Sequence, residues 1–121
     1  MFPWPDSGDA EAPKLRVLVV DDEPTLRLGF AYALSNKTTV VETAASGQQA
    51  LDRLASETFD VVVLDLRMPG LDGVGVIKAL RNEGSEIPVI LCSAALNSSA
   101  ALREIRHGVV DFLLKPVRPV D

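Results

Sequence analysis

A run of four aliphatic residues that ends in an acid constrains this chain more than any other feature. Residues 61–64 read Val-Val-Val-Leu, and Asp65 follows them directly. Such a run, rich in β-branched side chains, predicts a short strand that is buried on both faces of a sheet. Pro69 and Gly70 then turn the chain into a loop. In an open parallel sheet, ligands bind at the edge where the carboxyl ends of the strands lie. The position of Asp65 at the carboxyl end of its strand therefore predicts a functional carboxylate.

Strands and helices alternate along the sequence. Apolar runs predict five strands, at residues 15–20, 38–43, 60–65, 87–93 and 109–114. Apolar residues at helical spacing predict four helices, which begin near Pro24, Ser46, Asp72 or Gly73, and Asn97. This alternation predicts an α/β fold, a doubly wound five-stranded parallel sheet of the flavodoxin-like order 2-1-3-4-5.

Composition excludes several classes of protein. The chain has 121 residues and a formal net charge of −5, with no basic stripe to which nucleic acid would bind. Its single cysteine, Cys92, allows no internal disulfide and suits a cytoplasmic location. No apolar run reaches the roughly 18 residues that a membrane span requires. We therefore expect one domain that binds neither nucleic acid nor membrane.

The first residues differ in composition from the rest. Residues 1–14, which hold three prolines and several acids, predict a disordered tail before a domain at residues 15–121. The tail also holds one tryptophan, Trp4. Docking on the domain is one interpretation of Trp4, but an aromatic residue without a fixed contact is the one that the sequence favours.

Acids follow two strands that the predicted order makes neighbours. Asp21 and Asp22 come after the first strand, and Asp65 ends the third. Two unit charges about 4 Å apart repel by roughly 4 kcal/mol at an effective dielectric near 20, so such a cluster requires a cation. Carboxylate oxygens with few other donors favour Mg²⁺. A plainer interpretation is that these acids lie at a helix N-terminus, where they interact favourably with the helix dipole. It accounts for Asp21 or Glu23 but not for Asp65.

Two further polar residues follow the remaining strands. Ser93 ends the fourth predicted strand, and Lys115 follows the fifth. Taken alone, each has an ordinary explanation as a strand-end serine or a solvated lysine. Together, a hydroxyl, an ammonium and a metal ion around one carboxylate suit a phosphoryl group carried on that carboxylate.

Four stretches carry a resemblance to a known family. They read VLVVDDE at 17–23, VVLDLRMPGLDG at 62–73, VILCSA at 89–94 and DFLLKP at 111–116. In order and spacing they resemble the CheY-like receiver domain of two-component response regulators, over residues 15–117 or nearly all of the predicted domain. The resemblance implies a module that a histidine kinase or phosphotransfer protein phosphorylates, with Mg²⁺ as cofactor and no turnover of an external substrate.

The resemblance also implies roles for single residues. It makes Asp65 the phosphoacceptor and, with Lys115 and Ser93, part of the catalytic set. It implies that Mg²⁺ contacts Asp22, Asp65 and the backbone carbonyl of Arg67, and contacts Asp21 through a water. It further implies a cis peptide bond between Lys115 and Pro116.

A switch follows from the same resemblance. Ser93 and Phe112 are implied to be its moving parts. A phosphoryl group on Asp65 would attract the Ser93 hydroxyl and pull the loop after the fourth strand inward. This movement would vacate space that Phe112 could fill by rotating, and the face formed by the fourth helix and fifth strand would change shape. Simple core packing is the alternative explanation for Phe112.

Three other functions fit the sequence less well. A receiver-like interaction module that acts without phosphorylation is expected to lack an acid, the hydroxyl or the lysine, and all are present here. A Mg²⁺-dependent phosphohydrolase of the haloacid dehalogenase type would leave Asp65 without a role. A flavodoxin-type flavin site is disfavoured because Asp21 and Asp22 would repel the flavin phosphate.

One face of the predicted sheet has too few helices to cover it. Right-handed crossovers place the first helix alone on one face and the next three on the other. The resemblance implies a fifth helix after Lys115 and Pro116, but only residues 117–121 remain. We therefore expect a domain truncated at its C-terminus, with an output domain beyond Asp121 or self-association through the uncovered face.

Overall fold

The structure is a parallel sheet with helices on both faces. The computed structural model describes residues 14–93 and 111–114, with Ser93 and residues 111–114 described by their backbone alone. The sheet has the order β2-β1-β3-β4-β5, and every neighbouring pair is parallel. Its strands are β1 (Leu15–Val20), β2 (Thr39–Ala44), β3 (Val61–Asp65), β4 (Val89–Ser93) and β5 (Asp111–Leu114). The predicted fold and strand order are confirmed.

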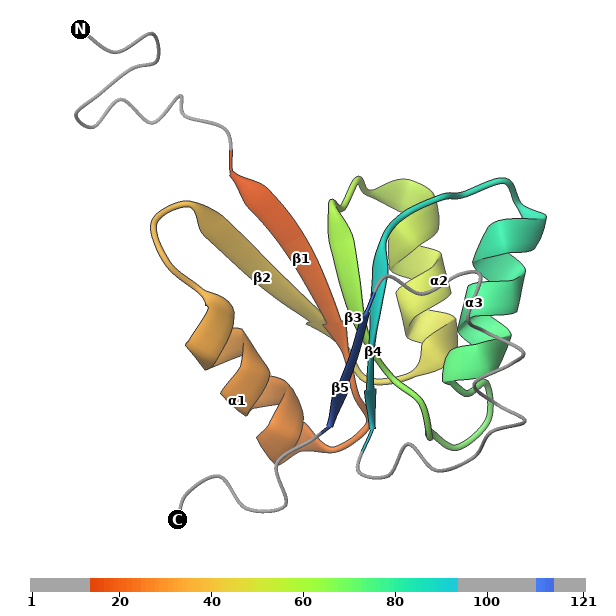
Figure 1. The fold of residues 1–121 in the computed structure, drawn as a ribbon, viewed down its shortest axis with the longest axis horizontal. Helices are drawn as coiled ribbons and strands as arrows, with labels where there is room; N and C mark the ends of the chain where they lie inside the picture. The colour runs from red at the N-terminus through yellow and green to blue at the C-terminus, as the bar shows by residue number, and fades with distance from the viewer. Residues whose placement is uncertain (1–13, 94–110, 115–121) are drawn as a thin grey trace, which may run out of the picture.

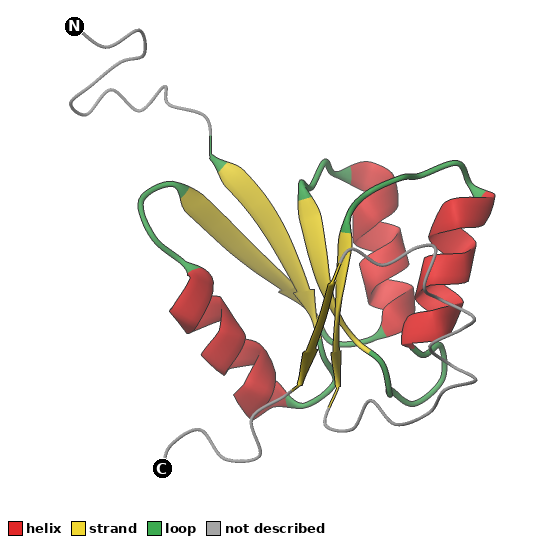
Figure 2. Cartoon of the chain, viewed as in Figure 1, coloured by secondary structure: helices red, strands yellow, loops and turns green. Residues whose placement is uncertain are grey.

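Three helices lie on the two faces of the sheet. They are α1 (Pro24–Leu34), α2 (Gly47–Ser56) and α3 (Gly73–Asn82). Figure 1 shows α1 on one face and α2 with α3 on the other, and Figure 2 shows the same layers by element type. Each of the described helices is too short or too polar to cross a lipid bilayer. The predicted split between the faces is confirmed for the three described helices.

The predicted helix ends depend on local hydrogen bonds. Ser46 caps α2, since its hydroxyl oxygen accepts a hydrogen bond from the Gln49 amide at 3.1 Å. Asp72 caps α3 in the same way, through the Gly75 amide at 2.9 Å. Gly84 lies just beyond α3 with a φ of 86°, a conformation that glycine adopts without strain.

Some predicted strand boundaries were wrong by one or two residues. The second strand begins at Thr39 and not at residue 38, the third at Val61 and not at 60, and the fourth at Val89 and not at 87. Pro88 has no N–H to contribute to a ladder, which explains the late start of β4. The predicted helix from Asn97 to Gly108, the cis bond before Pro116 and the missing fifth helix lie outside the described residues.

Alternating side chains divide the core into two parts. Leu18, Val62 and Leu64 are fully buried on the face that α2 and α3 cover. Val17 and Val63 point to the opposite face and form a smaller cluster with Cys92. Cys92 is 2% exposed and therefore belongs to the core.

A network of two arginines and two glutamates joins the start of the sheet to α2. Arg16 and Arg53 each bind both Glu42 and Glu57, and all four side chains are between 27% and 33% exposed. The Arg16 guanidinium lies 4.4 Å from the centroid of the Phe59 ring, and that of Arg53 lies 5.6 Å away. The network thus joins β1, β2 and the end of α2 around one aromatic ring.

Hydrogen bonds in this network shift the acidity of its carboxyl groups. Those from Arg16, and then Arg53, lower the pKa of Glu42 below its ordinary value of 4.5. Those from Arg53, and then Arg16, lower the pKa of Glu57. Because the folded-state values are the lower ones, the stabilisation is complete well above pH 4.5 and is lost as the pH falls through the lowered values.

We predict that Glu42→Gln lowers the urea midpoint of unfolding at neutral pH. The decrease will be small because partly exposed ion pairs contribute little. The variant will also lose less stability than the parent when the pH falls below 4.5. Glu86→Gln, which changes an exposed glutamate outside the network, is the matched control. Parallel pH curves for the parent and Glu42→Gln would contradict the prediction.

Candidate functional site

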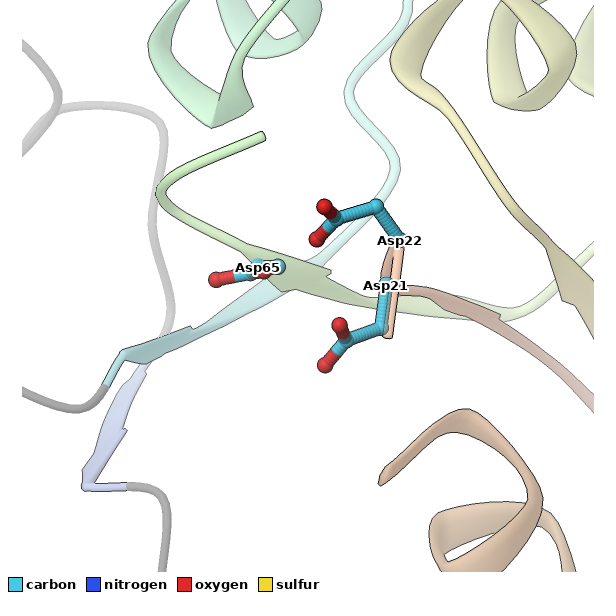
Figure 3. A group of neighbouring side chains, drawn as sticks. All are labelled: Asp21, Asp22 and Asp65. Atoms are coloured by element: carbon cyan, nitrogen blue, oxygen red, sulfur yellow. The ribbon is translucent and has the colours of Figure 1, made fainter. Parts of the chain in front are cut away.

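Three carboxylates meet where β1 and β3 end. Val20 of β1 is paired with Leu64 of β3, so the next residues, Asp21 and Asp65, leave neighbouring strands at the same level. Side-chain oxygens of Asp21, Asp22 and Asp65 all lie within 4.8 Å of one another. Figure 3 shows the three side chains gathered at this edge. The predicted meeting of these acids is confirmed.

Two of the three acids are buried. Asp65 is 4% exposed and Asp21 is 2% exposed, and they are the only buried charged residues in the part of the chain that the structure describes. Asp22 is exposed to solvent. Burial of an ionised carboxylate is costly unless it is hydrogen-bonded or paired. The site therefore combines two buried acids with one that remains open to an incoming ion.

Backbone amides hold the buried carboxylates in place. A side-chain oxygen of Asp65 accepts a hydrogen bond from the Arg67 amide at 3.2 Å. A side-chain oxygen of Asp21 accepts one from the Glu23 amide at 2.9 Å. Each bond joins a carboxylate to the amide two residues later, the pattern of an Asx turn. Both side chains are thus oriented by the turns that end their own strands.

The donor set fits a hard divalent cation. Unit charges 4.8 Å apart repel by about 3.5 kcal/mol at an effective dielectric of 20, and the attraction of each carboxylate to a cation between them outweighs that repulsion. The site presents only carboxylate oxygens from its side chains, and these are the ligands that Mg²⁺ prefers. The cluster therefore suits Mg²⁺ with water molecules in the remaining positions.

The loop after Asp65 is anchored at both ends. The Leu66 amide donates to the Cys92 carbonyl of β4 at 2.9 Å, and the Gly73 amide donates back to the Leu66 carbonyl at 3.0 Å. Leu66 and Met68 are buried, whereas Arg67 between them is exposed. Arg67 lines a shallow hollow of about 340 Å³ at the rim of the site, with Met68, Pro69 and Asp72. A ligand on Asp65 therefore approaches along a loop of fixed shape.

A glycine that the sequence analysis treated only as a helix start has a second role. A Cβ atom on Gly73 would lie 2.6 Å from the backbone oxygen of Asp65 and 2.9 Å from the Cα of Leu66. No real side chain tolerates such distances, so only glycine lets the start of α3 pack against the end of β3. Sequence spacing carries no signal of this contact, which is formed by the return of the loop.

Arg27 is another residue that the sequence analysis missed. Its guanidinium donates a hydrogen bond to the backbone oxygen of Asp21 at 2.8 Å, which ties α1 to the turn that carries the acids. A cation near the start of a helix interacts unfavourably with the helix dipole. The position of Arg27 near the start of α1 was therefore the sequence signal that could have pointed to a specific contact. Its contact with Asp21 explains why it lies there.

The structure places the other predicted residues only by their backbone or not at all. Ser93 ends β4 and is paired with Leu114, one residue past the pair formed by Asp65 and Cys92. Phe112 is paired with Leu91 inside β5. The side chains of Ser93 and Phe112, and all of Lys115, lie outside the described residues. Their roles at this edge remain predictions.

Comparisons with known proteins agree on one family. A family model described as the response regulator receiver domain matches residues 17–121. Response regulator MprA of Mycolicibacterium vanbaalenii is 39% identical over 102 residues, which cover 84% of this chain and 44% of the relative. MprA of Mycobacterium tuberculosis is 38% identical over the same length. The chain thus spans less than half the length of these curated relatives.

Solved structures of receiver proteins have the same overall fold. Chemotaxis protein CheY4 of Vibrio cholerae matches with a TM-score of 0.78 at 30% identity, covering 88% of this chain and 90% of that one. Response regulator TrrA of Thermotoga maritima, solved in complex with Mg(2+)-BeF, matches with a TM-score of 0.74 at 29% identity and covers 86% and 89%.

We predict that Gly73→Ala destabilises the fold and weakens the site. The added methyl group must displace the backbone at Asp65, and such overpacking costs about 1–3 kcal/mol. Urea unfolding with and without Mg²⁺ measures both effects. Gly29→Ala is the control, because a Cβ atom on that glycine of α1 would meet nothing within 4 Å. Equal behaviour of the two variants would contradict the close-packing argument.

Removal of the exposed acid should have opposite effects with and without metal. Asp22→Asn relieves repulsion and should stabilise the metal-free protein by about 1 kcal/mol, because solvent screens part of the interaction. It also removes a proposed ligand, so added Mg²⁺ should no longer raise the unfolding midpoint. Asp52→Asn, on the exposed side of α2, serves as control. A variant that Mg²⁺ stabilises as much as it does the parent would count against the metal site.

Proposed function

This chain belongs to the family of response regulator receiver domains, and from that premise we propose that Asp65 is the residue that accepts a phosphoryl group. One observation supports this assignment above the others. Asp65 is a buried carboxylate at the end of a central strand, and two further acids lie within 4.8 Å. Burial of such a carboxylate costs folding free energy, which a purely structural role does not explain. The neighbouring acids suit the metal ion that phosphoryl transfer requires.

Asp22 and Asp65 would contact Mg²⁺ directly, together with the backbone carbonyl of Arg67, and Asp21 would contact it through a water. The buried position of Asp21 and the exposed position of Asp22 are consistent with this division. A bound Mg²⁺ neutralises the charge on the phosphoryl oxygens. The TrrA structure with Mg(2+)-BeF supports the proposal by showing a related receiver with such a ligand.

The reaction itself requires little from the protein beyond position and charge. A carboxylate oxygen of Asp65 attacks the phosphorus of a phosphohistidine, and the new O–P bond forms as the N–P bond breaks. The electron pair of that bond returns to the imidazole of the donor, which takes a proton from solvent. The Arg67 amide holds the Asp65 carboxylate in one orientation for this attack.

Ser93 and Lys115 would bind the transferred group. The end of β4 places Ser93 one residue past the level of Asp65, and Lys115 follows Leu114, the partner of Ser93 in the sheet. The lysine supplies a positive charge and the serine a hydrogen bond. Movement of Ser93 toward the phosphoryl group, with rotation of Phe112, would then switch the face formed by β5 and the predicted fourth helix.

The partners follow from the same proposal. A histidine kinase or a phosphotransfer protein in the cytoplasm would supply the phosphoryl group. The chain covers 44% of the first MprA relative, which leaves room for an output domain beyond Asp121 in a protein of that length. Phosphorylation and dephosphorylation of Asp65 would be the only chemistry, with no external substrate turned over.

Incubation with Mg²⁺ and acetyl phosphate or phosphoramidate, followed by mass spectrometry, tests the proposal. We expect a mass increase of one phosphoryl group in the parent and none in Asp65→Asn or in the presence of EDTA. Asp60→Asn, which changes the residue just before the start of β3, is the matched control and should be phosphorylated like the parent. An unmodified parent that still binds Mg²⁺ would support an interaction module that acts without phosphorylation.

A further inference from the structure

The loop between β3 and α3 is held by side chains more than by hydrogen bonds. Backbone hydrogen bonds fix its two ends. The Arg67 amide donates to Asp65, but no hydrogen bond between described residues reaches residues 68–71. Met68 is buried in the larger core cluster, and Leu71 packs against the same cluster. Within the described part of the chain, apolar packing therefore holds the middle of this loop.

Leu71 lies where two helices come close to the loop. α2 and α3 lie side by side on the same face of the sheet (Figure 1). A Cβ atom on Gly47, the first residue of α2, would overlap the backbone oxygen of Leu71 and lie 3.1 Å from its Cβ atom. A Cβ atom on Gly75, in the first turn of α3, would lie 2.6 Å from the Cδ1 atom of Leu71. Each helix therefore has a residue without a side chain at its contact with Leu71.

We propose that Leu71 is a positioning residue, which fixes the loop against α2 and α3 and so keeps the backbone of Arg67 in place at the metal site. This role depends on the proposed function, in which the Arg67 carbonyl contacts Mg²⁺. A backbone carbonyl is oriented by the chain on either side of it and not by rotation of a side chain. The packing of the loop therefore decides whether this ligand is available to the metal.

The short stretch between Arg67 and Leu71 contains one flexible joint. Met68 is 7% exposed, and the ring of Pro69 fixes its own φ angle. Gly70 follows with a φ of 74° and has the widest choice of backbone conformations. Leu71 comes directly after this joint, so its packing removes the freedom that Gly70 would otherwise give to the loop. Mg²⁺ demands near-ideal octahedral geometry, and a loop that moves would therefore weaken its binding.

Leu54 allows a matched comparison with Leu71. It lies on α2, is partly buried like Leu71 and packs against the same core cluster. A leucine that contributes only apolar contacts should affect the stability of the fold and nothing else. Leu54→Ala therefore measures the general effect of removing such a side chain, whereas Leu71→Ala should in addition release the loop.

Amide hydrogen exchange and calorimetric titration with Mg²⁺ test this role. In the metal-free protein, the Arg67 amide, which donates to Asp65, should exchange severalfold faster in Leu71→Ala than in Leu54→Ala, after correction for the stability that each variant loses in urea. Leu71→Ala should also bind Mg²⁺ about tenfold more weakly than the parent, the lower end of the loss seen when a group that orients a metal ligand is removed. Leu54→Ala should bind Mg²⁺ like the parent.

Gly47→Ala reaches the same loop from α2 and leaves the loop sequence unchanged. The added methyl group would press on the backbone oxygen of Leu71, so this variant should also bind Mg²⁺ severalfold more weakly. Gly29→Ala, which adds a methyl group to α1 where nothing lies within 4 Å, should bind Mg²⁺ like the parent. This second pair of variants tests the role of Leu71 even if Leu71→Ala does not fold.

The outcomes separate this role from the proposed function. Equal Mg²⁺ affinity and equal exchange of the Arg67 amide in Leu71→Ala and Leu54→Ala would overturn the role of Leu71, whether or not Asp65 is phosphorylated. A parent that binds Mg²⁺ but gains no phosphoryl group would contradict phosphorylation, while weaker Mg²⁺ binding by Leu71→Ala would still support its positioning role. A parent that binds no Mg²⁺ would overturn both.

Discussion

The pairing of β1 with β3 is the constraint on which the rest of the structure depends. It brings together the ends of two buried strands and, with them, three carboxylates within 4.8 Å. Their mutual repulsion opposes the fold, and the burial of Asp21 and Asp65 increases that cost. The apolar side chains of both strands offset the repulsion, since Leu18, Val62 and Leu64 are fully buried beneath the helices. A stable core thus holds a site that is poised for a cation.

Close backbone packing converts this cluster into a site of defined shape. The loop after Asp65 leaves the sheet through a bond to Cys92 and returns through a bond from Gly73 to Leu66. Gly73 then lies so close to the Asp65 backbone that any side chain at this position would force the backbone to shift. Arg27 holds the other acidic turn from the side of α1. The acids therefore lie on short turns that the surrounding elements fix in place.

The two faces of the sheet differ in how completely they are covered. α2 and α3 bury a large cluster on one face, and the network of Arg16, Glu42, Arg53 and Glu57 joins the start of the sheet to α2. On the other face α1 buries no residue of its own and borders an apolar groove. Any occupant of that groove would add apolar contacts to β1 and β3, the strands that carry the acids. Occupancy would therefore stabilise the same pairing that builds the site.

The sequence by itself determined the strand order, the caps of α2 and α3 and the meeting of Asp21, Asp22 and Asp65. These features depend on local patterns, namely apolar runs, capping residues and acids at strand ends, which are read over a few neighbouring residues. Only the tertiary structure decided the contacts between elements that neither a local pattern nor the strand order predicts. The contact of Gly73 with Asp65, the bond from Arg27 to Asp21 and the groove beside Leu15 are of this kind. Each arises where separate elements pack together, and residue spacing carries no record of that packing.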